Sequence, residues 1–467
     1  MKPLVINILS LCSADVGTRL IGFLAFTYLA RILGPENMGI IAIGMAILTY
    51  ASIISTMGLP ALGVRSASVN KSSARNLVKR ICSTRFFLSI ISFLVIMGFL
   101  MIWVKEQNIR NVSIFYLFSL FPSALIIEWL FKGRSKVITL AIGQILGMSV
   151  YLLIIIGVVS NSQDIYWVPF AWFLGLFVQT IYFWINYKYF FRNENYENQP
   201  LHLYKIIKQG LPLGISGLIS HSVIQFPVIY LGFFDSTEKA GIYSVAFRVI
   251  IMMLVIDRVF STIFFPVISR SYKDSIAKLN ERVIWTLKIV TAGSLYIAVL
   301  ALITGRNLLP IIFGSEFRNS GLIFQILLGF FVLTTINSVF TFTLIGIEKE
   351  HLYTKSLFIG AMVFSAIIFS PLPLPATLIV SIALAAHEAV SMLMMMKYLR
   401  QFNLTNLFYR VFLALLVTII FVIIVVLWQH LYPILVPVGV AVLALPAIAI
   451  ASGINNDDIN TFKGLLK

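Results

Sequence analysis

The sequence predicts an all-α integral membrane protein with about fourteen transmembrane helices. Hydrophobic residues make up 59% of the 467 residues, charged residues make up only 11%, and the mean hydropathy is +0.96. A typical soluble protein has about 25% charged residues. Apolar runs of about 20 residues, the length that crosses a bilayer as a helix, recur along the chain. Composition and pattern therefore exclude a soluble globular protein.

Turn signals such as Gly34-Pro35, Gly58-Leu59-Pro60 and Pro371 to Pro375 separate the apolar runs. The predicted helices cover residues 8–32, 39–57, 86–104, 111–131, 137–159, 165–187, 209–232, 241–267, 283–304, 320–345, 352–370, 375–396, 411–429 and 433–452. We group them into an N-terminal lobe at 1–190, a linker at 191–208, a C-terminal lobe at 209–398 and two accessory helices at 409–456.

The charges indicate the topology. The chain has 35 Lys and Arg against 18 Asp and Glu, a net charge of +17. The connections that follow even-numbered helices hold most of these cations, for example residues 65–85 and 270–282. Because cytoplasmic loops of membrane proteins are enriched in Lys and Arg, both termini are predicted to be cytoplasmic. Topology thus explains the positive charge without a nucleic-acid partner.

The stretch from Gly241 to Arg270 carries Arg248, Asp257 and Arg258 within an apolar span. A charge at the bilayer centre costs about 2.5–3.5 kcal/mol even on the lenient insertion scale. On one continuous helix Arg248 and Arg258 would lie about 80° apart, with Asp257 about 180° from Arg248 and directed at a neighbouring helix. We consider two interpretations: a cationic wall of a transport cavity, or a snorkelling arginine with a local Asp–Arg contact.

An internal repeat relates the two halves. The segment from Gly39 and the segment from Gly241 each begin with glycine after a short polar turn, cross one apolar span to Pro60 or Pro266, and end in a basic connection. Gly133 and Gly346 form a second match at the ends of the fourth and tenth predicted helices. Two parallel six-helix repeats with a substrate site between them are a recurrent transporter plan.

One stretch of the sequence resembles the signature of a known family. LARILGPENMG, Leu29 to Gly39, resembles the LAR-x-LGP signature of bacterial polysaccharide flippases, members of the multidrug/oligosaccharidyl-lipid/polysaccharide exporter superfamily. Further similar pieces are Gly58-Leu59-Pro60 with Arg65, Gly210-Leu211-Pro212, Gly241 to Arg248, and Phe313 to Phe317. The resemblance covers about residues 1–400. It implies two six-helix lobes around a central cationic cavity, with two accessory helices, in the bacterial inner membrane.

The resemblance also implies the function. The family moves undecaprenyl-diphosphate-linked oligosaccharides from the cytoplasmic to the periplasmic leaflet, and the expected partners are this lipid, membrane lipids and proteins of polysaccharide assembly. The product is expected to be O-antigen (lipopolysaccharide), capsule or another exopolysaccharide. Arginine pairs well with phosphate oxygens, so the candidate substrate-binding cations are Arg19, Arg248, Arg258 and Lys288. The candidate sugar platforms, or simply packing residues, are Tyr28, Tyr50, Tyr151, Tyr243 and Trp129.

Other polar residues within spans are candidates for coupling or for the polar lining of a cavity. Asp15 and Arg19 are spaced for an ion pair on one helix. His221 and Gln225 repeat that spacing and suit either hydrogen-bonded packing or the cavity. Glu388, deep in a span, is a candidate for H⁺ or Na⁺ coupling, whereas Asp257 is expected to contact a helix neighbour. No cofactor or metal site is predicted, and Cys12 and Cys82 are expected to be free thiols.

Three other functions are weighed against the flippase. A cation-coupled drug exporter of the same superfamily is disfavoured by the clustered arginines, which would repel a cationic drug. A lipid II flippase shares the cationic cavity and stays open. A membrane glycan transferase or polymerase is disfavoured because the predicted outward connections are short and no catalytic spacing such as HExxH is present.

Overall fold

The computed structural model describes residues 2–69, 74–191, 203–400, 405–428 and 435–454. The side chains of some helical residues, including Cys12 and Arg258, lie outside this description. In the described ranges the chain is helical, with no strand, which confirms the predicted all-α class. Ten helical segments there are long and apolar enough to cross a membrane, and three shorter apolar segments occur at 221–234, 411–421 and 439–452. The chain is therefore a multi-pass membrane protein, and the count of fourteen stays a prediction.

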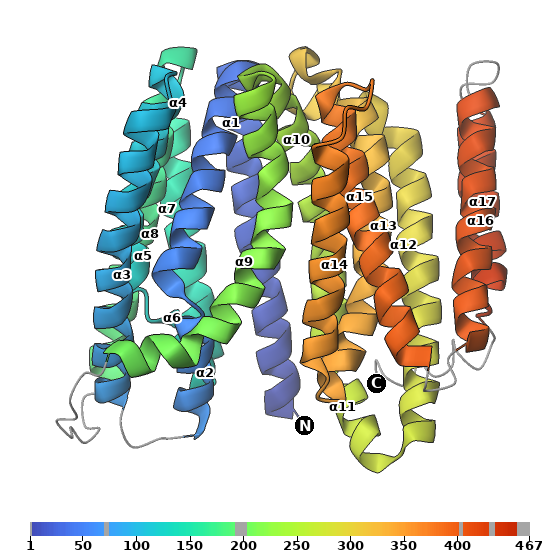
Figure 1. The fold of residues 1–467 in the computed structure, drawn as a ribbon, viewed down its shortest axis with the longest axis horizontal. Coiled ribbons are helices and arrows are strands. Elements are labelled where there is room, and N and C mark those ends of the chain that lie inside the picture. The colour runs from blue at the N-terminus through green and yellow to red at the C-terminus, as the bar shows by residue number, and fades with distance from the viewer. Residues whose placement is uncertain (1, 70–73, 192–202, 401–404, 429–434, 455–467) are drawn as a thin grey trace. The chain divides into compact units, whose positions relative to one another are not determined.

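The helices divide into two compact units, 1–245 and 246–467 (Figure 1). Unit 1 contains α1 (Lys2–Thr56), α2 (Leu59–Val69), α3 (Ala74–Trp103), α4 (Gln107–Leu117), α5 (Leu120–Leu125), α6 (Glu128–Gly133), α7 (Val137–Val158), the 3-10 turn η1 (Ser162–Tyr166), α8 (Trp167–Phe191), α9 (Leu203–Phe234) and the start of α10 (Thr237–Met253). The predicted lobe boundary at 191–208 stays a prediction, since residues 192–202 lie outside the described chain.

Unit 2 holds the rest of α10 and the remaining helices. These are α11 (Val255–Asp274), α12 (Ile276–Phe313), the turn η2 (Ser315–Phe317), α13 (Ser320–Gly346), α14 (Glu350–Ile368), α15 (Ala376–Leu399), α16 (Thr405–Trp428) and α17 (Leu435–Ser452). Helix α13 packs against α11, α12, α14 and α15, so it is the central helix of the unit. The predicted accessory pair corresponds to α16 and α17, which pack on each other and on α12.

The label α1 covers two helices that meet at a kink, and they correspond to the predicted helices 8–32 and 39–57. The junction is Gly34, whose φ of 72° and ψ of 176° lie outside the helical region. Glycine adopts this conformation without the steric cost that a β-carbon would bring. Pro35 then starts the second half, where its fixed φ suits a first helical turn and its missing N–H is not needed.

The predicted single helix at 241–267 is wrong in one respect. The structure divides it into α10 and α11, with a turn at Leu254, although residues 242–265 contain no glycine or proline. Arg248 belongs to α10, whereas Asp257 and Arg258 belong to α11. The angles computed for one continuous helix therefore do not hold across Leu254. The predicted helix at 111–131 is likewise divided, into α4, α5 and α6.

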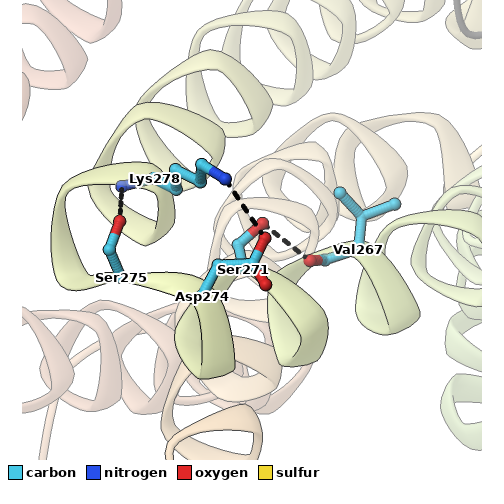
Figure 2. A network of polar contacts seen from close by, with 5 residues as sticks. All are labelled: Val267, Ser271, Asp274, Ser275 and Lys278. Atoms are coloured by element: carbon cyan, nitrogen blue, oxygen red, sulfur yellow. Dashed lines mark hydrogen bonds and ion pairs between the residues drawn. The ribbon is translucent and has the colours of Figure 1, made fainter.

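Several basic connections are helical, contrary to the predicted boundaries. Helix α3 begins at Ala74 and not near residue 86, and the 270–282 connection is a sharp corner between α11 and α12. Figure 2 shows the corner: the hydroxyl oxygen of Ser275, in extended backbone, accepts from the Lys278 N–H at 3.2 Å and so caps α12. Lys278 also lies 3.5 Å from Asp274. Ser271 donates to the Val267 carbonyl at 2.9 Å, within α11.

The glycines that begin the two repeat segments meet at one helix crossing inside unit 1. A β-carbon on Gly39 would overlap the carbonyl oxygen of Thr237, and a β-carbon on Gly241 would overlap the carbonyl oxygen of Pro35. Each obstructing carbonyl lies four residues before the other glycine. A two-fold axis relating two copies of one segment produces such reciprocity, which supports the internal repeat. Glycine is needed at both positions because the backbones approach so closely.

Candidate functional site

Two of the predicted polar residues meet the same helix in unit 2. Asn337 and Ser338 are consecutive residues of α13, and each contacts a carboxylate from a different neighbour. Asn337 Nδ2 donates to Glu388 Oε2 of α15 at 2.6 Å. Ser338 Oγ donates to Asp257 Oδ1 of α11 at 2.5 Å. We call Asn337, Ser338, Asp257 and Glu388 the polar seam.

Asn337 holds Glu388 at two points. Its Nδ2 also lies 2.9 Å from the main-chain carbonyl oxygen of Glu388, so one amide group contacts both the backbone and the side chain of that residue. Thr334, one turn earlier on α13, has a buried hydroxyl with no hydrogen-bond partner among the described residues. Asn337 itself is only 4% exposed. The carboxylate of Glu388 is thus oriented by a neutral amide within an apolar helix pair.

Asp257 has the helix neighbour that the sequence predicted, namely α13 through Ser338. Its neighbour in sequence, Arg258, lies outside the described side chains. The other two candidate cations of this unit, Arg248 on α10 and Lys288 on α12, are partly buried. Of the candidate cations, Arg19 belongs to unit 1 and the other three belong to unit 2.

The polar candidates of unit 1 form local contacts. Arg19 Nε lies 3.0 Å from Asp15 Oδ2, with side-chain exposures of 27% and 32%, so the predicted ion pair on α1 is present. On α9, Gln225 Nε2 donates to Thr49 Oγ1 of α1 at 3.4 Å, whereas His221 is exposed. These contacts agree with the packing interpretation of Gln225 and leave a role in the cavity a prediction.

The aromatic candidates are mostly packing residues. Trp129, Tyr151 and Tyr243 are buried, and Tyr151 forms an edge contact with Trp172 at 5.4 Å. The hydroxyls of the other two serve as donors to backbone carbonyls within unit 1: Tyr28 to Val159 at 2.9 Å and Tyr50 to Ser222 at 3.0 Å. In this arrangement the rings of the buried three cannot stack on a sugar.

Sequence reasoning missed a buried charge in unit 1. Arg85 was assigned to a basic connection, but it lies in α3, is 6% exposed, and donates to the carbonyls of Ser123 at 2.6 Å and Ile126 at 2.9 Å. Ile126 lies between α5 and α6, and Ser123 lies in the last turn of α5, where its carbonyl also accepts from the Ile126 N–H at 3.2 Å. Trp184 of α8 donates to the Leu125 carbonyl at 3.0 Å, and the Thr180 hydroxyl lies 3.1 Å from the Pro122 carbonyl and 2.7 Å from the Leu176 carbonyl of its own helix. Arg85 and Trp184 thereby satisfy backbone groups that a broken transmembrane helix exposes.

Sequence reasoning also missed Asn337, Ser338 and Thr334. The signal for them is present: the run TTINSVFTFT, Thr334 to Thr343, places several polar residues in an apolar helix. Cys82 is a buried free thiol, as expected, and Cys12 lies outside the described side chains. Across the described residues, no group of three or more His, Cys, Asp and Glu side chains is placed to hold a metal ion.

The fold is that of transporters of the MATE and MOP type. A structure described as a MATE in complex with MaL6 aligns with a TM-score of 0.59 and 13% identity, over 85% of this chain and 96% of that one. A MOP superfamily transporter from Pyrococcus furiosus aligns with a TM-score of 0.59 and 15% identity, over 86% and 96%. An inward-facing multidrug resistance MATE family transporter gives 0.58 and 15%, over 84% and 94%.

The family follows from the sequence match. Residues 4–272, more than half of the chain, match the family described as polysaccharide biosynthesis protein, and the chain belongs to that family. The match includes the stretch from Leu29 to Gly39 that carries the flippase-like signature. No curated protein sequence matches the chain. The suspected superfamily is confirmed by the family and the fold together.

Proposed function

We propose that the chain is a flippase that moves undecaprenyl-diphosphate-linked oligosaccharides from the cytoplasmic to the periplasmic leaflet of the bacterial inner membrane by alternating access. The observation that carries this proposal is the coincidence of a polysaccharide biosynthesis family match with a transporter fold. A chain that serves polysaccharide synthesis through a transporter fold needs a saccharide cargo, and a lipid-linked saccharide is the form in which sugars are assembled at a membrane.

Intramembrane cations support a diphosphate as the recognised group. Arg19, Arg248 and Lys288 lie in apolar helices, partly buried, and Arg258 lies on α11. A cation in such a helix is costly unless it meets an anion or a wet cavity, and of these cations Arg19 already meets the carboxylate of Asp15. Guanidinium groups form paired hydrogen bonds with phosphate oxygens, so they suit a diphosphate better than a cationic drug.

The polar seam supports coupling to H⁺ or Na⁺. Glu388 is held by the neutral amide of Asn337, so the carboxylate can bind a cation without first breaking an ion pair with that group. The other atom of this amide, Asn337 Oδ1, is buried and has no hydrogen-bond partner among the described residues, so it is a further oxygen on the residue that holds the carboxylate. Hard cations prefer oxygen ligands, and a proton needs only the carboxylate.

Export by cells that carry Arg248 variants tests the proposal. Arg248→Ala should abolish glycan export while the protein remains at normal abundance in the membrane. Arg248→Lys should restore export only in part, because an ammonium keeps the charge and loses the paired geometry. Arg270→Ala is the matched control, since Arg270 is an exposed arginine near the end of α11.

The same cells distinguish the other functions. Loss of lipid II translocation in the Arg248→Ala cells, with the other glycans exported normally, would identify a lipid II flippase. Increased efflux of cationic dyes by the unaltered chain, with no effect of the variant on glycan export, would identify a drug exporter. Full glycan export by Arg248→Ala would remove this arginine from the substrate site.

A further inference from the structure

A groove lies on the surface of unit 1, beside the break between α5 and α6. Its cavity of about 860 Å³ is formed mainly by α3, with walls completed by Leu125 of α5 and by Trp184 and Tyr187 of α8. A second hollow of about 630 Å³ shares Arg75 and Tyr187 with the first and extends to Lys188. The residues of α3 in the groove, such as Phe87 at 50% exposed, belong to a face that is apolar and open along most of the helix.

The chemistry of the groove changes along its length. Arg75, Lys79 and Ser83 follow one another at intervals of four residues, so they share one face of α3, and Phe87 and Ile90 continue it. The cations thus lie at one end and the apolar side chains at the other. None of the described side chains that line either hollow is acidic. A ligand that fits both ends must combine an anionic group with an apolar chain.

The position along α3 agrees with a membrane interface. Helix α3 has 30 residues and spans about 45 Å at a rise of about 1.5 Å per residue. The hydrocarbon core is about 30 Å thick, so the end of α3 that carries Arg75 and Lys79 extends into the headgroup region. Trp184 and Tyr187 lie beside it, and such amphipathic aromatic residues prefer that level of the membrane.

The aromatic wall is fixed before any ligand binds. Trp184 Nε1 donates to the Leu125 carbonyl at 3.0 Å, so the indole is held against the break in α5. Tyr187 packs edge-on against Trp184, with the ring centroids 5.5 Å apart. A wall that is already ordered loses little freedom when a ligand arrives, which favours binding.

We propose that this groove binds an anionic phospholipid, with its phosphate between Arg75 and Lys79 and an acyl chain along Phe86, Phe87 and Ile90. Basic pockets between transmembrane helices at the membrane surface recognise anionic headgroups in this way. A soluble anion would leave the apolar end of the groove unused, and a zwitterionic lipid would use the cations less well. The residues of the lipid site include none of the candidate substrate cations and none of the residues of the polar seam.

Native mass spectrometry of the full chain tests the proposal. The protein is released from nanodiscs that contain equal amounts of phosphatidylglycerol and phosphatidylcholine with the same acyl chains. The unaltered chain should retain phosphatidylglycerol, and the double variant Arg75→Gln/Lys79→Gln should lose about 10- to 30-fold of that preference, as expected for two surface cations. Arg65→Gln/Lys132→Gln is the control, because it removes the same charge from exposed positions of unit 1 outside the groove.

A third variant separates the groove from general attraction to a basic surface. Ser83→Trp places a large ring between the cationic and apolar ends, at an exposed position, without changing the charge. It should reduce the retained phosphatidylglycerol as strongly as the double variant. Equal losses in the control, unchanged retention in Ser83→Trp, displacement of the lipid by millimolar inorganic phosphate, or a preference for undecaprenyl phosphate over phosphatidylglycerol would each overturn the proposal.

Discussion

Two places in the molecule hold charge inside helices, and they hold it differently. At the break between α5 and α6, Arg85 donates to two backbone carbonyls, and Thr180 and Trp184 cover two more. At the polar seam, the carboxylate and the main-chain carbonyl of Glu388 accept from the amide of Asn337. The first charge is fixed to the main chain, and the second is held by a neutral side chain.

The difference separates a structural charge from one that can take part in transport. Removal of Arg85 exposes backbone carbonyls that have no water to replace it, so the cost falls on the fold. Glu388 is held by a neutral amide, and under the proposed coupling its charge would change while Asn337 stays in place. Burial alone does not separate these two kinds of charge, whereas the group that holds each charge does.

The largest expected effect is a loss of stability at the break between α5 and α6. Arg85→Met should destabilise the protein by about 3–6 kcal/mol, because two hydrogen bonds from a charged group contribute about 1.5–3 kcal/mol each. Thermal unfolding in detergent measures this, with Arg80→Met on the same helix as the control. If Arg85→Met melts at the temperature of the unaltered protein, Arg85 does not hold the break together.

The next largest expected effect is that Glu388→Gln loses coupled transport while the protein still folds. Glu388→Gln keeps an oxygen that can accept from Asn337, yet it cannot bind or release a proton. Transport in proteoliposomes should lose its response to an imposed pH or Na⁺ gradient. Asp257→Asn is the control, because it can still accept from Ser338 and should keep the response. A wild-type response in Glu388→Gln would place the coupling group elsewhere.

A double-mutant cycle measures the coupling free energy between Asn337 and Glu388 in the polar seam. Asn337→Leu and Glu388→Leu, alone and together, should give a coupling free energy of about 1–3 kcal/mol, since residues in one hydrogen-bond network are not additive. The readout is the free energy of unfolding in denaturant. Additive losses would mean that the 2.6 Å contact contributes nothing to stability.

The smallest expected effect is a loss of stability from a neutral side chain beside the break between α5 and α6. Thr180→Val keeps the shape of the side chain and removes a neutral hydroxyl donor that lies 3.1 Å from the Pro122 carbonyl and 2.7 Å from the Leu176 carbonyl. It should cost about 1 kcal/mol, well below the cost of Arg85→Met. A loss of stability as large as that of Arg85→Met would show that the charge of Arg85 is not the reason for its large contribution at the break.

The sequence was sufficient for the class of fold, the family and some local pairs. Apolar length predicts membrane helices directly, and the spacing of Asp15 and Arg19 predicts their ion pair because i,i+4 neighbours share a helix face. The reciprocal contact of Gly39 and Gly241 agrees with the internal repeat read from their segments. Each of these features depends on residues close in sequence or on a pattern that repeats.

The missed features depend on contacts between distant segments. The turn at Leu254 has no glycine or proline to signal it, so packing must produce it. Arg85 follows several cations in sequence and reads as part of a basic loop, but its partners lie 38 and 41 residues away. Asn337 was visible as a polar residue, yet only the packing of α13 on α15 reveals that its partner is Glu388.

The central claim, that the chain flips a lipid-linked oligosaccharide, has a direct test. The purified full chain is placed in liposomes with undecaprenyl-diphosphate trisaccharide, and the fraction of sugar reached by an impermeant galactose oxidase is followed with time. The account predicts that the protein lets the enzyme reach sugar initially confined to the inner leaflet, and that Arg248→Ala does not. Equal accessibility with and without the protein, in liposomes that contain the folded chain, would contradict the account.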